Sequence, residues 1–303
     1  MHYLSTALCL VLAASSSPLL AQQVIPVWGD ETPAYAIDHD LVEYETDCWG
    51  DVRCVRQVVD PTLTLYLPQG AASDTAIVVI PGGGYEGEAV YHEGYEIAQA
   101  FADRGITAAV LKYRLPNPQT ASPPERAPAA DVRRALKLMR GKQEDLGFKA
   151  SRVGVAGFSA GGHLAASVSV HASATEAENP DFSILVYGVS RMSPENREWL
   201  EKTLYHRAMT EQEVAAQTLY QRVDGRTPPA FLVHAYDDDV CHYSESTLYA
   251  EALQRHGVAA EMHLYAHGGH GFGPGHDDDG TGQWIGLAAD WLKRMETQQE
   301  TGQ

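Results

Sequence analysis

Short apolar runs alternate along the chain with amphipathic segments, and this alternation predicts strands and helices in turn. Continuously apolar runs are typical of parallel strands buried on both faces, and four occur at 76–80, 108–111, 184–187 and 230–233. The segment 62–67 alternates polar and apolar residues, which predicts an antiparallel edge strand. In 129–140 and 284–291 apolar residues recur at i, i+3, i+4 and i+7, which predicts helices.

This order of elements predicts an α/β fold with a mostly parallel, doubly wound sheet. We expect it to form one domain over residues 61–298, preceded by an acidic N-terminal extension with a first strand in 22–60. The charged, helix-prone segment 190–228 interrupts the alternation. It is either a small cap over the functional site or a plain surface excursion.

The net charge argues against two kinds of partner. The 303 residues include 40 acidic and 22 basic side chains, a formal charge of −18, and no basic cluster offsets it. Such a surface repels nucleic acid and anionic membranes, so we expect neither as a partner.

Residues 1–21 have the pattern of a secretory signal peptide, with an apolar core over 4–14 and a small residue, Ala21, at the expected cut. The apolar run is too short for a membrane-spanning helix, so we expect no span in the mature chain. The chain is therefore predicted to be secreted or periplasmic.

After removal of that peptide the chain keeps three cysteines. Cys48 and Cys54 either close a small disulfide loop in an oxidising compartment or remain free thiols, and Cys241 would stay unpaired. Their spacing matches no zinc site. The aspartate runs 237–239 and 277–279 are solvated turns or cation sites, but neither has the spacing of a calcium loop, so we expect no metal.

The strongest motif is Gly157-Phe158-Ser159-Ala160-Gly161-Gly162. It follows a predicted strand at 152–156 and opens a predicted helix at 163–170, the setting that a nucleophile elbow requires. The turn is too tight for large flanking side chains, which explains glycine on either side of Ser159. The positive end of the following helix would favour negative charge developing there.

A second motif, Pro81-Gly82-Gly83-Gly84-Tyr85, directly follows the predicted strand 76–80. Glycines let backbone N–H groups approach a substrate oxygen, as an oxyanion hole needs. A phosphate-binding loop is the alternative, but neither Gly-Lys-Ser/Thr nor G-x-G-x-x-G spacing is present. We therefore favour the oxyanion interpretation.

Two further loops follow late strands and complete a candidate triad. The run Asp237-Asp238-Asp239 comes after the strand 230–233, and His270 lies between glycines after the strand 261–265. The chain order Ser, Asp, His is the one that α/β-hydrolases use. His267 is the rival base, while we expect His234 to order the acid loop.

Two other polar residues stand near these motifs. We expect His163, in the first turn after the elbow, to be a packing or hydrogen-bonding residue rather than a catalytic one. Arg114 could steady the second motif, residues 81–85 (the glycine loop), or touch substrate, and the structural role is favoured.

Together the segments PGGGY (81–85), LKYRLP (111–116), GFSAGGHLAA (157–166), FLVHAYDDD (231–239) and GGHGFG (268–273) resemble secreted bacterial α/β-hydrolases related to acetyl xylan esterases and feruloyl esterases. Their wider relatives form the hormone-sensitive-lipase group, whose glycine motif begins with His where this chain has Pro81. The resemblance implies a nucleophile, base and acid at Ser159, His270 and Asp238. It also implies oxyanion donors at the backbone amides of Gly83, Gly84 and Ala160.

The acid loop departs from that resemblance, because Ala235 replaces a glycine and His242 stands where proline is common. The register of the acid therefore has to be tested against Asp237 and Asp239.

The resemblance implies a serine esterase that hydrolyses short-chain, chiefly acetyl, esters on a polysaccharide or oligosaccharide, without a cofactor. Feruloyl esterase, lactonase and general carboxylesterase activities are alternatives on the same triad. An inactive hydrolase-fold binding module is the alternative outside enzymes. Such modules usually lose the nucleophile or the base, whereas both are present here.

Overall fold

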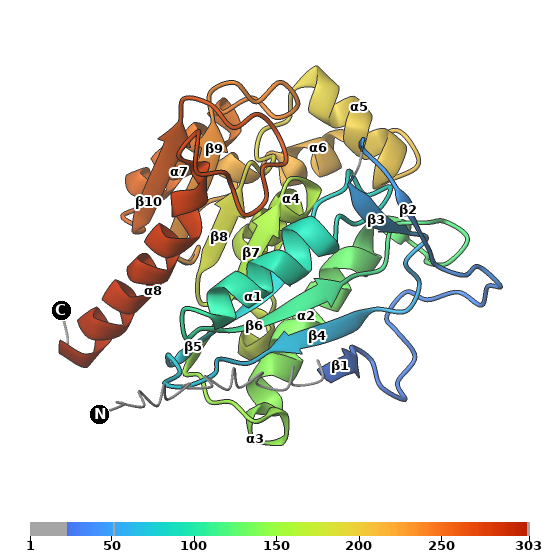
Figure 1. Cartoon of the computed structure of the whole chain (residues 1–303). Coiled ribbons are helices and arrows are strands. Elements are labelled where there is room, and N and C mark those ends of the chain that lie inside the picture. Colours follow the sequence, from blue (N-terminus) through green and yellow to red (C-terminus); the bar gives the residue numbers. More distant parts are fainter. Residues whose placement is uncertain (1–22, 51, 302–303) are drawn as a thin grey trace, which may run out of the picture.

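An eight-stranded sheet forms the centre of the protein (Figure 1). The structure is a computed structural model that describes residues 23–50 and 52–301. The strands of this sheet are β1 (Gln23–Pro26), β4 (Thr62–Tyr66), β5 (Thr75–Ile80), β6 (Thr107–Lys112), β7 (Arg152–Phe158), β8 (Ser183–Val186), β9 (Ala230–Ala235) and β10 (Ala260–Tyr265). Their order is β1-β4-β6-β5-β7-β8-β9-β10. Among the described strands of this sheet, the antiparallel pairs are those of β4 with β1 and with β6, so the predicted mostly parallel sheet is confirmed.

The prediction that 62–67 forms an edge strand is wrong. This segment is β4, and β1 pairs along its outer side, with Gln23 opposite Leu65 and Ile25 opposite Leu63. The side chains of β4 are buried apart from Thr62, which is half-buried. The N-terminal extension thus covers an edge that would otherwise present unpaired backbone groups.

Helices pack on both faces of the sheet, as the doubly wound prediction requires. The α-helices are α1 (Glu96–Ala102), α2 (Ala127–Gly141), α3 (Gln143–Leu146), α4 (Ala160–Val170), α5 (Pro194–Thr203), α6 (Glu211–Gln217), α7 (Ser244–Arg255) and α8 (Trp284–Thr301). A π-helical turn, η1 (Tyr91–Tyr95), precedes α1, and 3-10 turns are η2 (Pro124–Arg126), η3 (Glu176–Glu178), η4 (Leu219–Gln221) and η5 (Thr281–Gln283). Figure 1 shows α1 and α8 in front of the sheet, with α2 and α4 behind it.

The rest of the N-terminal extension forms a hairpin of β2 (Tyr44–Asp47) and β3 (Arg53–Arg56). A disulfide joins Cys48 to Cys54 across its turn, and Cys241 is a buried free thiol. Val55 exchanges two backbone hydrogen bonds with Glu88, at 3.0 and 2.8 Å. The hairpin is therefore fixed beside the segment that follows the glycine run. The predicted signal peptide, 1–21, lies outside the described residues.

The segment 190–228 holds α5, α6 and η4 above the carboxyl end of the sheet (Figure 1). Some of its apolar side chains are buried in the protein core, and others, Met192, Trp199, Val214 and Tyr220, are half-buried and pack against it. The buried ones are Leu200, Leu204, Tyr205, Met209, Leu219 and Val223. Across the described ranges, no helix combines the length and hydropathy needed to cross a membrane.

Candidate active site

Ser159 occupies a strained turn between β7 and α4. Its backbone φ of 50° and ψ of −117° lie outside the ordinary regions for a side-chain-bearing residue. A Cβ on Gly157 would lie 2.2 Å from the Gly161 carbonyl oxygen, and one on Gly161 would lie 2.2 Å from the Ile80 carbonyl oxygen. The elbow therefore needs glycine at these two positions, as the motif predicts.

Because β7, β9 and β10 run parallel, the loops after them meet at one edge of the sheet. There the Oγ of Ser159 lies 2.9 Å from Nε2 of His270. The Nδ1 of His270 lies 2.8 Å from Oδ2 of Asp238. The structure thus brings together the three residues that the sequence motifs and the resemblance single out. His270 lies between Ser159 and Asp238, as the base does in a catalytic triad.

Asp238 is held as an ionised acceptor. Its Oδ1 accepts hydrogen bonds from the amides of Val240 at 2.9 Å and Cys241 at 2.8 Å. Burial alone would raise the pKa of Asp238, but hydrogen bonds from His234 and His270 outweigh burial and hold that pKa well below its usual range. The carboxylate can therefore keep the His270 imidazole oriented with its Nδ1 proton toward Oδ2.

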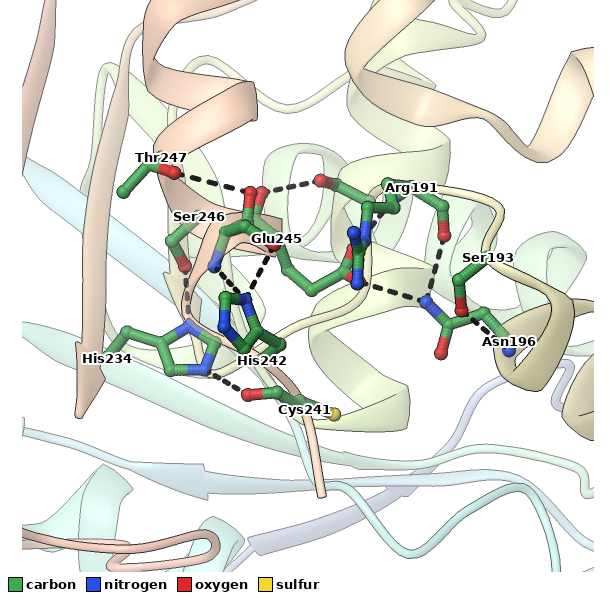
Figure 2. A network of polar contacts seen from close by, with 11 residues as sticks. Arg191, Ser193, Asn196, His234, Cys241, His242, Glu245, Ser246 and Thr247 are labelled. Carbon is green, nitrogen blue, oxygen red and sulfur yellow. Dashed lines mark hydrogen bonds and ion pairs between the residues drawn. The ribbon is translucent and has the colours of Figure 1, made fainter. Parts of the chain in front are cut away.

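The start of α7 orders the loop that carries Asp238 (Figure 2). Ser246 Oγ lies 2.8 Å from Nδ1 of the buried His234, and Nε2 of His234 lies 2.7 Å from the carbonyl oxygen of Cys241. The ordering role expected for His234 therefore matches its contacts.

The neighbouring Glu245 anchors the entry to the 190–228 segment (Figure 2). Its buried carboxylate accepts hydrogen bonds from the backbone N of Arg191 at 2.7 Å, the Nε of Arg191 at 3.0 Å and the Nδ2 of Asn196 at 2.9 Å. The Ser193 side chain caps α5 by accepting a hydrogen bond from the backbone N–H of Asn196. One helix end thus positions both the acid loop and α5.

The glycine loop lies directly against the elbow. The amide of Gly82 is taken, because it donates to Oε2 of Glu93 at 2.8 Å. Within the described part of the chain, the amides of Gly83, Gly84 and Ala160 donate no hydrogen bond. The three amides that the resemblance implies as oxyanion donors are therefore available to a substrate oxygen.

Helix α5 covers the loop from outside. Trp199 Nε1 donates to the carbonyl oxygen of Gly84 at 3.1 Å, and its ring stacks on Tyr85 with centroids 5.6 Å apart. Tyr85 in turn places its hydroxyl 2.8 Å from Nδ1 of His163. His163 is thus a packing and hydrogen-bonding residue, and burial lowers its pKa to about 4.

Sequence reasoning missed Glu93, a buried carboxyl in η1 behind the glycine loop. Its Oε1 accepts a hydrogen bond from the Tyr187 hydroxyl at 2.9 Å, and that hydroxyl accepts one from the Gly273 amide at 2.9 Å. Burial raises the pKa of Glu93, while Tyr187 and the nearby His270 act against the rise. Glu93 therefore links the glycine loop to the loop that carries His270.

A signal for Glu93 does exist in the sequence. Glu93, Ile97 and Phe101 follow one another at intervals of four and are all buried, so a carboxyl stands on an apolar helical stripe. Such a residue is expected to have polar partners in the interior.

The other candidates lie outside the triad. The side chain of His267 is 78% exposed and contacts Asp237 at 3.3 Å, so it does not reach Ser159. Arg114 is buried in an ion pair with Asp131 at 2.7 Å, which is the structural role favoured from the sequence. Asp279 accepts a hydrogen bond from the Thr281 amide. No group of three or more potential metal ligands occurs within the described residues.

The sheet order, the strand-to-helix turn at Ser159 and the later acid and histidine loops define an α/β-hydrolase. The chain belongs to the BD-FAE family of esterases, whose profile matches residues 63–253. This is a family of carboxylic ester hydrolases, and the family resemblance stated from the sequence motifs is confirmed.

Two of the relatives that this chain matches are named for xylan. An acetylxylan esterase of Xylanibacter ruminicola is 30% identical over 250 residues, which are 78% of this chain and 49% of that protein. Endo-1,4-beta-xylanase B of Butyrivibrio fibrisolvens is 28% identical over 75% of this chain and 36% of its own length. The chain therefore spans about half or less of these relatives.

A solved structure matches over a larger share of both chains. The acetyl ester-xyloside bifunctional hydrolase of Caldicellulosiruptor lactoaceticus is 30% identical, with a TM-score of 0.75 over 92% of this chain and 99% of that one. Propionate-bound esterase Est2 of Thermogutta terrifontis is 27% identical, with a TM-score of 0.64 over 78% of this chain and 90% of its own.

Proposed function

We propose that this esterase removes short acyl groups, chiefly acetyl, from a saccharide through an acyl-enzyme on Ser159. The observation that carries the proposal is the unbroken line from Ser159 Oγ through His270 to Asp238, at 2.9 and 2.8 Å, beside three free amides. The acetylxylan esterase relative and the acetyl ester hydrolase structure support the acyl group and the saccharide.

The steps follow from the geometry. Ser159 Oγ attacks the ester carbonyl carbon while His270 Nε2 takes its proton, and Asp238 stabilises the resulting imidazolium. The free amides of the glycine loop and elbow bind the oxyanion. His270 then gives the proton to the leaving alkoxide as the C–O bond breaks. Water attacks the acyl-enzyme by the reverse proton path and releases the acid.

Replacing the nucleophile tests the mechanism. In Ser159→Ala protein, hydrolysis of 4-nitrophenyl acetate should fall by about 10⁶ in kcat, the usual cost of losing a triad member. The circular dichroism spectrum should match that of the wild type. Near-normal turnover in the folded variant would overturn the proposed nucleophile.

Acyl size is the second part of the proposal. The apolar side chains of 190–228 are used in packing, with Leu200 and Leu219 fully buried, which supports a site without a long acyl tunnel. Octanoate would gain about 0.8 kcal/mol per extra buried methylene only if such a tunnel received it. We expect kcat/KM for 4-nitrophenyl esters to peak at acetate or butyrate, and a peak at octanoate would reject the short-acyl proposal.

Acetate release from acetylated xylan, compared with hydrolysis of methyl ferulate, separates the proposed saccharide esterase from a feruloyl esterase. A lactone and simple alkyl esters complete the panel. Preference for any of these over acetylated xylan would move the protein to the corresponding alternative.

Export is a further part of the proposal. The pattern of residues 1–21 supports it, and the Cys48–Cys54 disulfide suits an oxidising compartment. Sequencing the N-terminus of the mature protein should find Gln22, and a retained Met1 would reject export by cleavage.

A further inference from the structure

A cavity of about 500 Å³ lies beside the glycine loop. Its walls come from the hairpin, the glycine loop, the segment 115–120 and the end of α5, with lining residues that include Tyr44, Gln57, Glu86 and Lys202. Tyr85 also lines it and directly follows Gly84 in the chain. The cavity therefore reaches the residue next to Gly84, whose amide is one of the three free ones.

The polar groups of this cavity suit an uncharged ligand. Lys202 lies 3.5 Å from the Glu86 carboxylate, and Arg56 donates to the Glu86 carbonyl oxygen at 3.1 Å, so both cations already have partners. Within the described residues, the side chain of Gln57 makes no hydrogen bond, and Nδ2 of Asn117 donates none. Two amides are thus available to hydroxyl groups.

Gln57 also has an unusual backbone. Its φ of 52° lies in the left-handed region, which side-chain-bearing residues seldom adopt. The next residues, Val58 and Val59, are buried and hold this geometry in place. Strain of this kind is often retained where a side chain has to be aimed at a ligand.

An exposed aromatic residue contacts the glycine loop. Trp49, within the disulfide-closed turn of the hairpin, is 46% exposed. Its Cη2 would lie 2.9 Å from a Cβ on Gly83, so the ring edge touches the backbone that carries the oxyanion amides. The electron-rich face of an indole attracts the C–H face of a sugar ring.

We propose that the cavity is a subsite for the saccharide chain of the substrate, with Gln57 and Asn117 binding hydroxyl groups and Trp49 supporting a sugar ring. The ligand class is a neutral, hydroxyl-rich oligosaccharide. This inference rests on the proposed function and deepens it, because it assigns the part of the protein that recognises the alcohol side of the ester.

Three acetate esters test the subsite: 4-nitrophenyl acetate, an O-acetylated methyl xyloside and an O-acetylated xylotetraose. The wild type should have its highest kcat/KM on the xylotetraose. Gln57→Gly removes the amide and relieves the positive φ, so the fold is kept. We expect it to lower kcat/KM on the xylotetraose by about five- to tenfold, through KM, as the loss of a neutral hydrogen bond predicts. The two smaller esters should be unaffected.

Tyr35→Gly is the matched control. Tyr35 also has a positive φ, at 64°, and belongs to the same N-terminal extension, but it lines a different cavity. The Tyr35→Gly variant should have the wild-type kcat/KM on all three substrates. An equal fall on every substrate, or the same effect from Tyr35→Gly, would overturn the subsite.

The outcomes separate this inference from the proposed function. Hydrolysis of the methyl xyloside without any gain on the xylotetraose would reject the subsite and leave the saccharide esterase standing. Hydrolysis of 4-nitrophenyl acetate alone would reject both. Calorimetry gives a measure independent of turnover: Ser159→Ala protein should bind unacetylated xylohexaose. The double variant with Gln57→Gly should bind it more weakly. If the Ser159→Ala single variant does not bind xylohexaose, the subsite is also rejected.

Discussion

Gly82→Ala should damage catalysis by crowding the elbow. A Cβ on Gly82 would lie 2.6 Å from Glu93 Oε2, 2.7 Å from the Phe158 carbonyl oxygen and 2.8 Å from Ser159 Cβ, whereas ordinary contacts begin at 3.4 Å. The backbone of Gly82 lies outside the left-handed region, so crowding acts without added φ strain.

The magnitude follows from the missing space. The elbow and the glycine loop must separate by about 0.6 Å or more at Ser159, and a misplacement of 1 Å can cost about 10²-fold in rate. We expect kcat on 4-nitrophenyl acetate to fall by some tens of fold. Overpacking should also cost about 1–3 kcal/mol of stability.

The assay compares kcat and melting temperature with those of Gly286→Ala. Gly286 lies in α8 with nothing within 4 Å of an added Cβ, so alanine there should keep activity and stabilise the helix by up to about 1 kcal/mol. Wild-type kcat in folded Gly82→Ala protein would refute the close fit of the glycine loop against Ser159.

Three further predictions concern the ionisable groups. Asp238→Asn should reduce kcat by about 10³- to 10⁴-fold because the His270 tautomer is lost. Asp239→Asn, at an exposed position, should reduce kcat far less. If Asp239→Asn reduced kcat more than Asp238→Asn, Asp239 and not Asp238 would be the acid of the triad. Glu93→Gln should lower kcat about tenfold with little change in KM, and should cost about 1–3 kcal/mol of stability, since one acceptor is exchanged for a donor facing the buried Gly82 amide or Tyr187 hydroxyl; unchanged kcat would limit Glu93 to packing. The pKa of His163 falls from 6.5 to about 4 on folding through burial, so its contribution to stability is complete above pH 6.5 and is lost as pH falls toward 4. This corresponds to about 3 kcal/mol, and chemical denaturation of His163→Asn protein at pH 7.5 and 4.5 should show a smaller pH dependence than the wild type.

Features that depend on short stretches of chain could be predicted from the sequence. The elbow around Ser159 needs glycine two residues away on either side, because the chain turns back on itself within that segment. Buried parallel strands must be apolar on both faces, so the runs ending near Ile80 and Val233 could be recognised. Late loops after such strands necessarily meet at one sheet edge, which pointed to the run 237–239 and to His270, and the family resemblance selected Asp238 within that run.

The sequence by itself determined the fold class, the elbow and the order of the triad, since each depends on local geometry or on strand direction. Only the tertiary structure decided that β1 covers β4, that Glu93 joins two loops and that Gln57 and Trp49 border the glycine loop. These contacts join segments distant in the chain or fill space between separate elements. Their partners are selected by packing and hydrogen bonding in three dimensions, which no spacing along the chain records.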